Sequence, residues 1–122
     1  SQTDLRNEAS EWLYSNLPRG SSVVIDKYGP YLSSEHHQVA YVASIFEKDL
    51  QAYRDASVDY LVVNQMNYML ILNAAPDPRT SETRQLQLSR ASQIVTELPL
   101  EKEFTGPAVF ANGMRVHVYR LE

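Results

Sequence analysis

The sequence contains no cysteine. A disulfide framework, a thiolate zinc site and a cysteine-ligated iron–sulfur cluster are therefore excluded, while the redox compartment stays open. Long hydrophobic runs are also missing, since no stretch approaches the roughly 18 consecutive apolar residues of a membrane-spanning helix. We expect this stretch of chain to fold as a soluble domain.

Positive charge and glycine are both scarce. The 11 lysines and arginines are outnumbered by 15 acidic residues, which gives a net charge of −4, whereas nucleic-acid-binding modules usually carry a basic patch. The four glycines, at positions 20, 29, 106 and 113, fall in no dinucleotide-binding or phosphate-cradling pattern. We therefore expect neither a nucleic-acid partner nor a nucleotide cofactor.

The strongest structural signal is the apolar run at residues 59–64, which contains β-branched residues and has a polar residue at each end. An unbroken run is typical of a parallel strand covered by helices on both faces, whereas a strand with one wet face would alternate. Residues 22–26 give a second signal of the same kind, so we expect the two strands to be adjacent, parallel and buried. Residues 39–45 are ambiguous between strand and helix, and we favour the strand.

Periodic apolar positions predict helices around these strands. The expected helices cover residues 4–17, 46–56, 69–72 and 82–98. Trp12 should anchor the first of them on the sheet. Residues 100–105 and 115–121 alternate instead, which predicts a closing antiparallel pair that Ala108 to Ala111 could extend. The sequence therefore predicts an α/β fold in a single three-layer domain spanning residues 1–122, with a Rossmann-like mixed sheet and a C-terminal antiparallel strand pair.

Polar and aromatic side chains follow the two buried strands at their carboxyl ends, the edge at which open α/β sheets usually bind ligands. Phenol rings stack on sugar rings, and phenol and amide groups donate hydrogen bonds. The candidate substrate-binding residues are Asp26, Tyr28, Tyr31, Asn64, Gln65, Asn67 and Tyr68. The alternative is that these are ordinary loop-packing and capping residues. The tyrosines expected to pack in the core or between helices are Tyr14, Tyr41, Tyr53 and Tyr60.

Residues with catalytic or metal-binding chemistry occur, but not in patterns that predict a site. Glu35, His36 and His37, with Asp26 upstream, are the one cluster of metal-ligand types, and adjacent histidines point too far apart to share one ion. His117 alternates with valines and should point outward from a strand. No Gly-x-Ser-x-Gly elbow or comparable nucleophile context is present. We therefore expect no catalytic residue, no metal site and no cofactor in this stretch.

Several segments together resemble a known family. They are Glu11 to Ser21, Tyr53, Val58 to Val63, Glu103-Phe104 and Val116 to Leu121. In this pattern the chain is similar to the soluble C-terminal domain of bacterial polytopic membrane glycosyltransferases that resemble the dolichyl-phosphate-mannose protein mannosyltransferases. It departs from that pattern at Ala56-Ser57, where relatives often have a glycine, and in an insertion from Ala108 to Met114.

The resemblance implies a place in a larger protein. In that family a membrane portion takes a sugar from a polyprenyl-phosphate donor and delivers it on the extracytoplasmic side of the cell membrane, and the catalytic acid lies in that portion. The present chain would then be an accessory extracytoplasmic domain that helps to position a glycan acceptor or the lipid-linked sugar, with the membrane portion of the same polypeptide as its partner. The alternative is a free-standing α/β ligand-binding or protein-interaction module.

Overall fold

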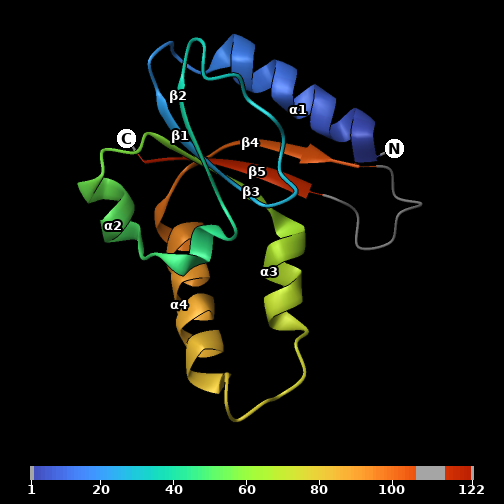
Figure 1. The fold of residues 1–122 in the computed structure, drawn as a ribbon, viewed down its shortest axis with the longest axis vertical. Coiled ribbons are helices and arrows are strands. Elements are labelled where there is room, and N and C mark those ends of the chain that lie inside the picture. The colour runs from blue at the N-terminus through green and yellow to red at the C-terminus, as the bar shows by residue number, and fades with distance from the viewer. Residues whose placement is uncertain (1, 107–114, 122) are drawn as a thin grey trace.

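The chain is built on one five-stranded mixed sheet in the computed structural model, which describes residues 2–106 and 115–121 (Figure 1). The strands are β1 (Ser22–Asp26), β2 (Gln38–Val42), β3 (Tyr60–Asn64), β4 (Leu100–Thr105) and β5 (Arg115–Arg120). Their order across the sheet is β2-β1-β3-β5-β4. Helices cover both faces, so the predicted three-layer α/β architecture is confirmed. The extension expected at residues 108–111 lies outside the described residues.

β3 is the centre of the sheet, and all of its residues are buried. It pairs in parallel with β1, so that Val24 lies opposite Leu61. Successive residues of a strand point to opposite faces. Leu61 and Val63 therefore enter one core, whereas Tyr60 and Val62 enter the other. The prediction of two adjacent, parallel and buried strands is confirmed.

β5 lies inside the sheet rather than at its edge. It pairs antiparallel with β3 on one side and with β4 on the other, which confirms the closing antiparallel pair. The expected alternation in β5 is incomplete, because Val116, Val118 and Tyr119 are all buried. Helices cover both faces at this position, so Tyr119 packs in a core instead of facing solvent. β4 forms the edge, and among its residues Phe104 alone is buried.

The ambiguous stretch at residues 39–45 divides into a strand and one turn of 3₁₀ helix. β2 ends at Val42 and pairs in parallel with β1, and Ile45 then begins η1 (Ile45–Glu47). Ser44 caps this turn by accepting a hydrogen bond from the Phe46 N–H at 3.1 Å. The predicted strand is therefore right for residues 39–42 and wrong for residues 43–45, because the Ser44 cap starts a helical turn there.

One face of the sheet is covered by α1 (Gln2–Asn16). Leu5, Ala9 and Leu13 are buried from this helix, at a spacing that keeps them on one side of it. Trp12 packs edge-on against Phe104 of β4, with ring centroids 5.9 Å apart. The predicted helix and its tryptophan anchor are confirmed.

The opposite face is covered by η1, α2 (Leu50–Asp55), α3 (Gln65–Leu72) and α4 (Ser81–Glu97). The single helix expected at 46–56 is wrong in its first part, because Asp49 accepts a hydrogen bond from the Ala52 N–H at 2.9 Å and begins a new helix. Arg90 of α4 donates to the Phe46 and Glu47 carbonyl oxygens, at 3.2 and 2.7 Å. This contact holds η1 against α4.

α3 and α4 extend beyond the sheet at the lower end of the molecule in Figure 1. α3 begins directly after β3, earlier than the helix expected at 69–72. α4 agrees with its prediction within one residue at each end and buries Ala91 and Ile94, but Val95, expected on the buried face, is 53% exposed. Within the described residues, no helix combines the length and the apolar character needed to cross a bilayer.

α2 ends at a residue with left-handed backbone that is not glycine. Ser57 has a φ of 58°, its N–H donates to the Arg54 carbonyl at 3.0 Å, and the Val58 N–H donates to the Tyr53 carbonyl at 3.1 Å. These two bonds form a Schellman motif, in which the left-handed position favours glycine. Ser57 therefore carries a conformational cost of about 1 kcal/mol at the place where the resembled family often has a glycine.

Shortening a buried side chain of β3 should lower the stability of the protein. Leu61 is fully buried, so Leu61→Ala should lower the free energy of unfolding by about 2–5 kcal/mol through lost burial and a residual cavity. Urea denaturation followed by circular dichroism measures this. Leu100→Ala, at a position that is 49% exposed on edge strand β4, is the matched control and should cost far less. Equal losses would contradict a core centred on β3.

A glycine at position 57, where the backbone is left-handed, should stabilise the protein. Ser57→Gly removes the left-handed penalty but adds chain entropy to the unfolded state, so the expected net gain in unfolding free energy is about 0.5 kcal/mol. Ser57→Ala keeps the penalty and should show no such gain. Thermal unfolding of the three proteins side by side makes the comparison, and a lower midpoint for the glycine variant would refute the argument.

Candidate functional site

Asp26 ends β1 with a carboxyl group that is only 2% exposed. Its Oδ1 accepts a hydrogen bond from the Asn64 N–H at 2.8 Å, whereas its Oδ2 has no hydrogen-bond partner among the described residues. Burial raises the pKa of Asp26 to about 7, and the hydrogen bond from Asn64 opposes part of that rise. The side chain is therefore close to the balance between its neutral and charged forms at neutral pH.

Two amide side chains hold the loop that follows β1. Asn64 donates through Nδ2 to the Tyr28 carbonyl at 3.0 Å, and Asn67 donates through Nδ2 to the Lys27 carbonyl at 2.9 Å. Asn64 Oδ1 also accepts from the Met66 N–H at 2.9 Å, which caps the start of α3. Both asparagines are buried. In this structure these two candidate residues serve as loop-packing and capping groups.

The loop that they hold is a tight turn. The Gly29 N–H donates to the Asp26 carbonyl at 3.0 Å, and Tyr28, at the third position of the turn, has a φ of 67°, where glycine is favoured. Gly29 is closely packed as well, because a Cβ at this residue would lie 2.7 Å from Ile25 Cγ2. Tyr28 keeps a half-exposed ring, with Lys27 Nζ 5.1 Å from its centroid. The Tyr28 ring is thus open to contact with a ligand.

The other three candidate residues have different surroundings. Tyr68 belongs to α3 and packs edge-on against Phe46, with ring centroids 5.9 Å apart. Gln65 begins α3 and is half-buried. Tyr31, which is 70% exposed, lines a separate groove next to α1. Hydrogen bonds thus bring Asp26, Asn64 and Asn67 together at the turn that carries Tyr28, whereas Tyr31 borders the groove.

That groove lies between α1 and the loop joining β1 to β2. It has a volume of about 370 Å³ and is lined by Ser10, Glu11, Tyr14, Ser15, Tyr31, Leu32 and Ser33. Tyr14 was expected to pack in the core, but it is 45% exposed and borders the groove from the outer side of α1. Tyr41, expected to be packed too, is 54% exposed because β2 is an edge strand. Exposure of these two tyrosines corrects the sequence-based expectation.

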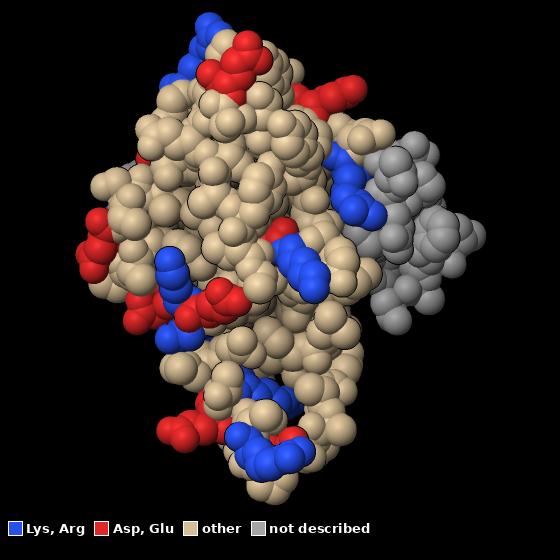
Figure 2. Space-filling view, in the orientation of Figure 1, with Lys and Arg blue, Asp and Glu red and all other residues tan. Residues whose placement is uncertain are grey.

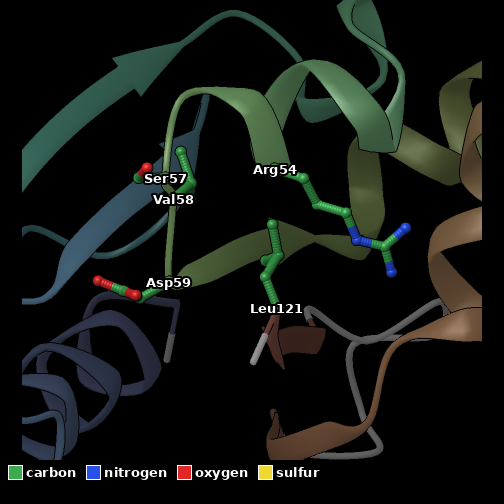
Figure 3. A pocket seen from close by; sticks show the side chains of 5 residues that line it. All are labelled: Arg54, Ser57, Val58, Asp59 and Leu121. Carbon is green, nitrogen blue, oxygen red and sulfur yellow. The ribbon is translucent and has the colours of Figure 1, made fainter.

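A larger hollow lies at the opposite end of the sheet, where β3 begins (Figure 3). Its volume is about 540 Å³, and it is lined by Arg54, Ser57, Val58, Asp59 and Leu121. Asp59 and Arg54 point in different directions in Figure 3. Asp59 Oδ2 accepts a hydrogen bond from the Ser22 N–H at 2.8 Å, so it is used to join β3 to β1. The hollow is at the amino ends of the parallel strands, away from the edge that the sequence favoured.

The adjacent histidines contact different partners near the end of α1. His37 is 3% exposed, and its Nε2 lies 3.0 Å from the Leu17 carbonyl oxygen, to which it donates. His36 lies 2.7 Å, through Nδ1, from the Arg19 guanidinium and packs against the Tyr14 ring. In the part of the chain that the structure describes, no group of three or more His, Asp or Glu side chains is placed to hold a metal ion.

Sequence reasoning missed a hydrogen-bonded chain across β4 and β5. His117 Nε2 lies 2.5 Å from Glu103 Oε2, and His117 Nδ1 lies 3.1 Å from the Tyr119 hydroxyl. His117 was expected to point outward, but its side chain is only 16% exposed because helices cover this face. The contact arises from the strand register, which places Glu103 opposite His117 and is not visible in the sequence. Such a chain can pass a proton, yet Tyr119 at its end is buried.

The buried carboxyl group should make stability depend on pH. The pKa of Asp26 is 3.8 in a solvated chain and about 7 in the fold, so the fold favours the protonated form. The contribution of Asp26 to the free energy of unfolding is fully present below about pH 4. It is lost progressively as pH rises to about 7, and the total loss is about 4 kcal/mol at most.

Asp26→Asn should remove this loss, since an amide does not ionise here. Urea midpoints measured between about pH 4 and pH 8 should fall less steeply in the variant than in the unmodified protein, and the difference between the two profiles isolates Asp26 from the other titrating groups. Parallel profiles would show that Asp26 stays ionised in the fold, against the argument from burial.

The chain was compared with known proteins in three ways. No protein-family model, no curated protein and no solved structure matches it. The resemblance to the soluble domains of polytopic glycosyltransferases, and everything it implies about activity, therefore stays a prediction.

Proposed function

We propose that this chain is an accessory extracytoplasmic domain of a membrane glycosyltransferase that transfers a sugar from a polyprenyl-phosphate donor. Its role is to assist the positioning of the glycan acceptor or the lipid-linked sugar. The membrane portion of the same polypeptide is its partner and carries the catalytic residue. The domain does not transfer sugar by itself.

The observation that supports this proposal is that the segments carrying the resemblance contact one another across the fold. Trp12 packs on Phe104, and the Leu121 N–H donates to the Asp59 carbonyl at 2.9 Å. Phe104 in turn lies opposite Val116, the first residue of the last segment, in the β4–β5 pair. The resemblance therefore involves one connected framework from α1 to the last strand, rather than scattered positions.

The side chains of the described residues are better suited to binding a ligand than to catalysing a reaction. The carboxyl group of Asp26 is closed to solvent, and the chain from Glu103 through His117 ends on a buried phenol. By contrast, Tyr28 and Tyr31 present exposed rings, which can stack on a sugar and donate hydrogen bonds. A binding role beside a catalytic membrane portion fits this distribution.

The proposal is tested in the parent gene and its full-length product. The gene should encode several membrane spans upstream of Ser1. Removal of residues 1–122 should lower sugar transfer from a polyprenyl-phosphate donor by about tenfold or more, because a positioning contribution of about 1.4 kcal/mol is lost. Transfer is measured in isolated membranes with a radiolabelled sugar donor, and the isolated chain is assayed alongside.

Two controls accompany this measurement. Blotting of the truncated protein shows that the membrane portion still inserts, and protease added to spheroplasts should digest the domain from outside. A parent gene without membrane spans, or transfer by the isolated chain, would overturn the proposal. The first of those results would favour the free-standing binding module instead.

A further inference from the structure

We propose that the groove between α1 and the β1–β2 loop is a saccharide-binding site that receives one uncharged pyranose ring against Tyr14 and Tyr31. The proposal says where in the domain a ligand binds and to which chemical class that ligand belongs. Only the biological origin of the sugar, as part of a glycan acceptor, rests on the proposed function; the binding site is argued from the residues of the groove.

Tyr31 is presented by a loop that is fixed on both sides of it. Pro30 and Leu32 are buried. The Leu32 N–H donates to the Tyr41 hydroxyl and the Tyr41 hydroxyl donates to the Leu32 carbonyl, both at 3.1 Å. The Tyr31 ring nevertheless remains 70% exposed between these anchors. The backbone that carries Tyr31 is therefore already ordered, which lowers the entropy lost when the ring binds a ligand.

Tyr14 presents a second ring from α1. Its neighbour Leu13 faces the core, so Tyr14 lies on the outer side of the helix and is 45% exposed. The ring packs against His36 with centroids 5.5 Å apart, and His36 is held by Arg19. The Tyr14 ring is thus supported by a neighbouring side chain, and Tyr31 stands on an anchored stretch of loop. Supported aromatic rings offer the apolar faces on which the C–H face of a pyranose can rest.

The remaining lining groups suit hydroxyls rather than charges. Ser10, Glu11 and Ser15 lie on the same side of α1 as Tyr14, and Ser33 lines the groove from the loop. Ser33 Oγ already accepts from the Glu35 N–H at 3.1 Å, which leaves its hydroxyl proton to donate elsewhere. Serine hydroxyls donate and accept, and a carboxylate accepts, so together they match the hydroxyl groups of a sugar.

Charge narrows the ligand class further. Figure 2 shows charged side chains of both signs scattered around a largely uncharged upper middle of this face of the molecule, without a broad basic patch. The described residues that line the groove include one carboxylate and no lysine or arginine. A phosphate or pyrophosphate group would find no cation there. The groove therefore fits the neutral sugar of an acceptor, not the phosphate of a lipid-linked donor. Its volume of about 370 Å³ is at the small end of ligand sites, which suits a single pyranose ring.

The test is a titration of the ¹⁵N-labelled chain followed by amide chemical shifts. The probes are the methyl pyranosides of mannose, glucose and N-acetylglucosamine, and inorganic phosphate is the charged counter-probe. At least one pyranoside should bind with a dissociation constant in the millimolar range, as expected for a shallow one-ring site. The shifts should centre on Tyr14, Tyr31 and Ser33, and phosphate should produce none there.

Variants assign the contact to the groove. Tyr31→Ala and Tyr14→Ala should each weaken binding by about tenfold, whereas Tyr31→Phe, which keeps the ring, should weaken it by less than about threefold. Leu86→Ala removes a comparably exposed apolar side chain outside the groove and should leave binding unchanged. Circular dichroism checks that each variant is folded.

The results of these experiments test the saccharide site independently of the proposed function. No binding of any pyranoside, binding unaffected by Tyr31→Ala, or shifts centred on Tyr28 would overturn the groove as a saccharide site, even if deletion of the domain lowers sugar transfer. Conversely, binding that depends on Tyr14 and Tyr31 would support the site even if the parent gene encoded no membrane spans, and only the glycosyltransferase assignment would then fall.

Discussion

The fold depends on burying β3 on both faces. An apolar strand of this kind cannot lie at an edge or face water, so the chain must supply a helical layer on each side and a strand at each margin. α1 supplies one layer, and η1 with α2 to α4 supplies the other. β1 pairs along one margin of β3, and β5 pairs along the other, which is why the last strand lies inside the sheet.

Burial of β3 also determines what happens at its carboxyl end. Asn64 is completely buried, so its backbone N–H and its side chain must find partners inside the protein. The N–H donates to Asp26, and the side chain caps α3 and holds the Tyr28 carbonyl. Because α3 begins directly after β3, the polar groups of Asn64 at the edge where open sheets usually bind ligands are already used in bonds within the protein. A groove with exposed aromatic rings lies instead beside α1, where the long β1–β2 loop leaves Tyr31 at the surface.

The sequence predicted the elements whose signals are local. Unbroken apolar runs identified β1 and β3, and helical spacing identified α1 and α4. The helix expected at 46–56 was broken by capping at Asp49, a competition between local hydrogen bonds that periodicity does not reveal. Exposure of Tyr14 and the contact of Glu103 with His117 depend on which elements become neighbours and in what register. Those features of the site arise from tertiary structure, so no pattern along the chain could predict them.

The most direct measurement of the central claim is native-state amide hydrogen exchange of the intact chain. If β3 is the element around which the rest is packed, the amides of Leu61 to Val63 should exchange only through global unfolding, with protection equal to the full unfolding free energy. The Asn64 amide, bonded to buried Asp26, should belong to the same group, and amides of edge strand β2 should exchange faster through local opening. Exchange of the β3 amides as fast as those of β2 would contradict the account.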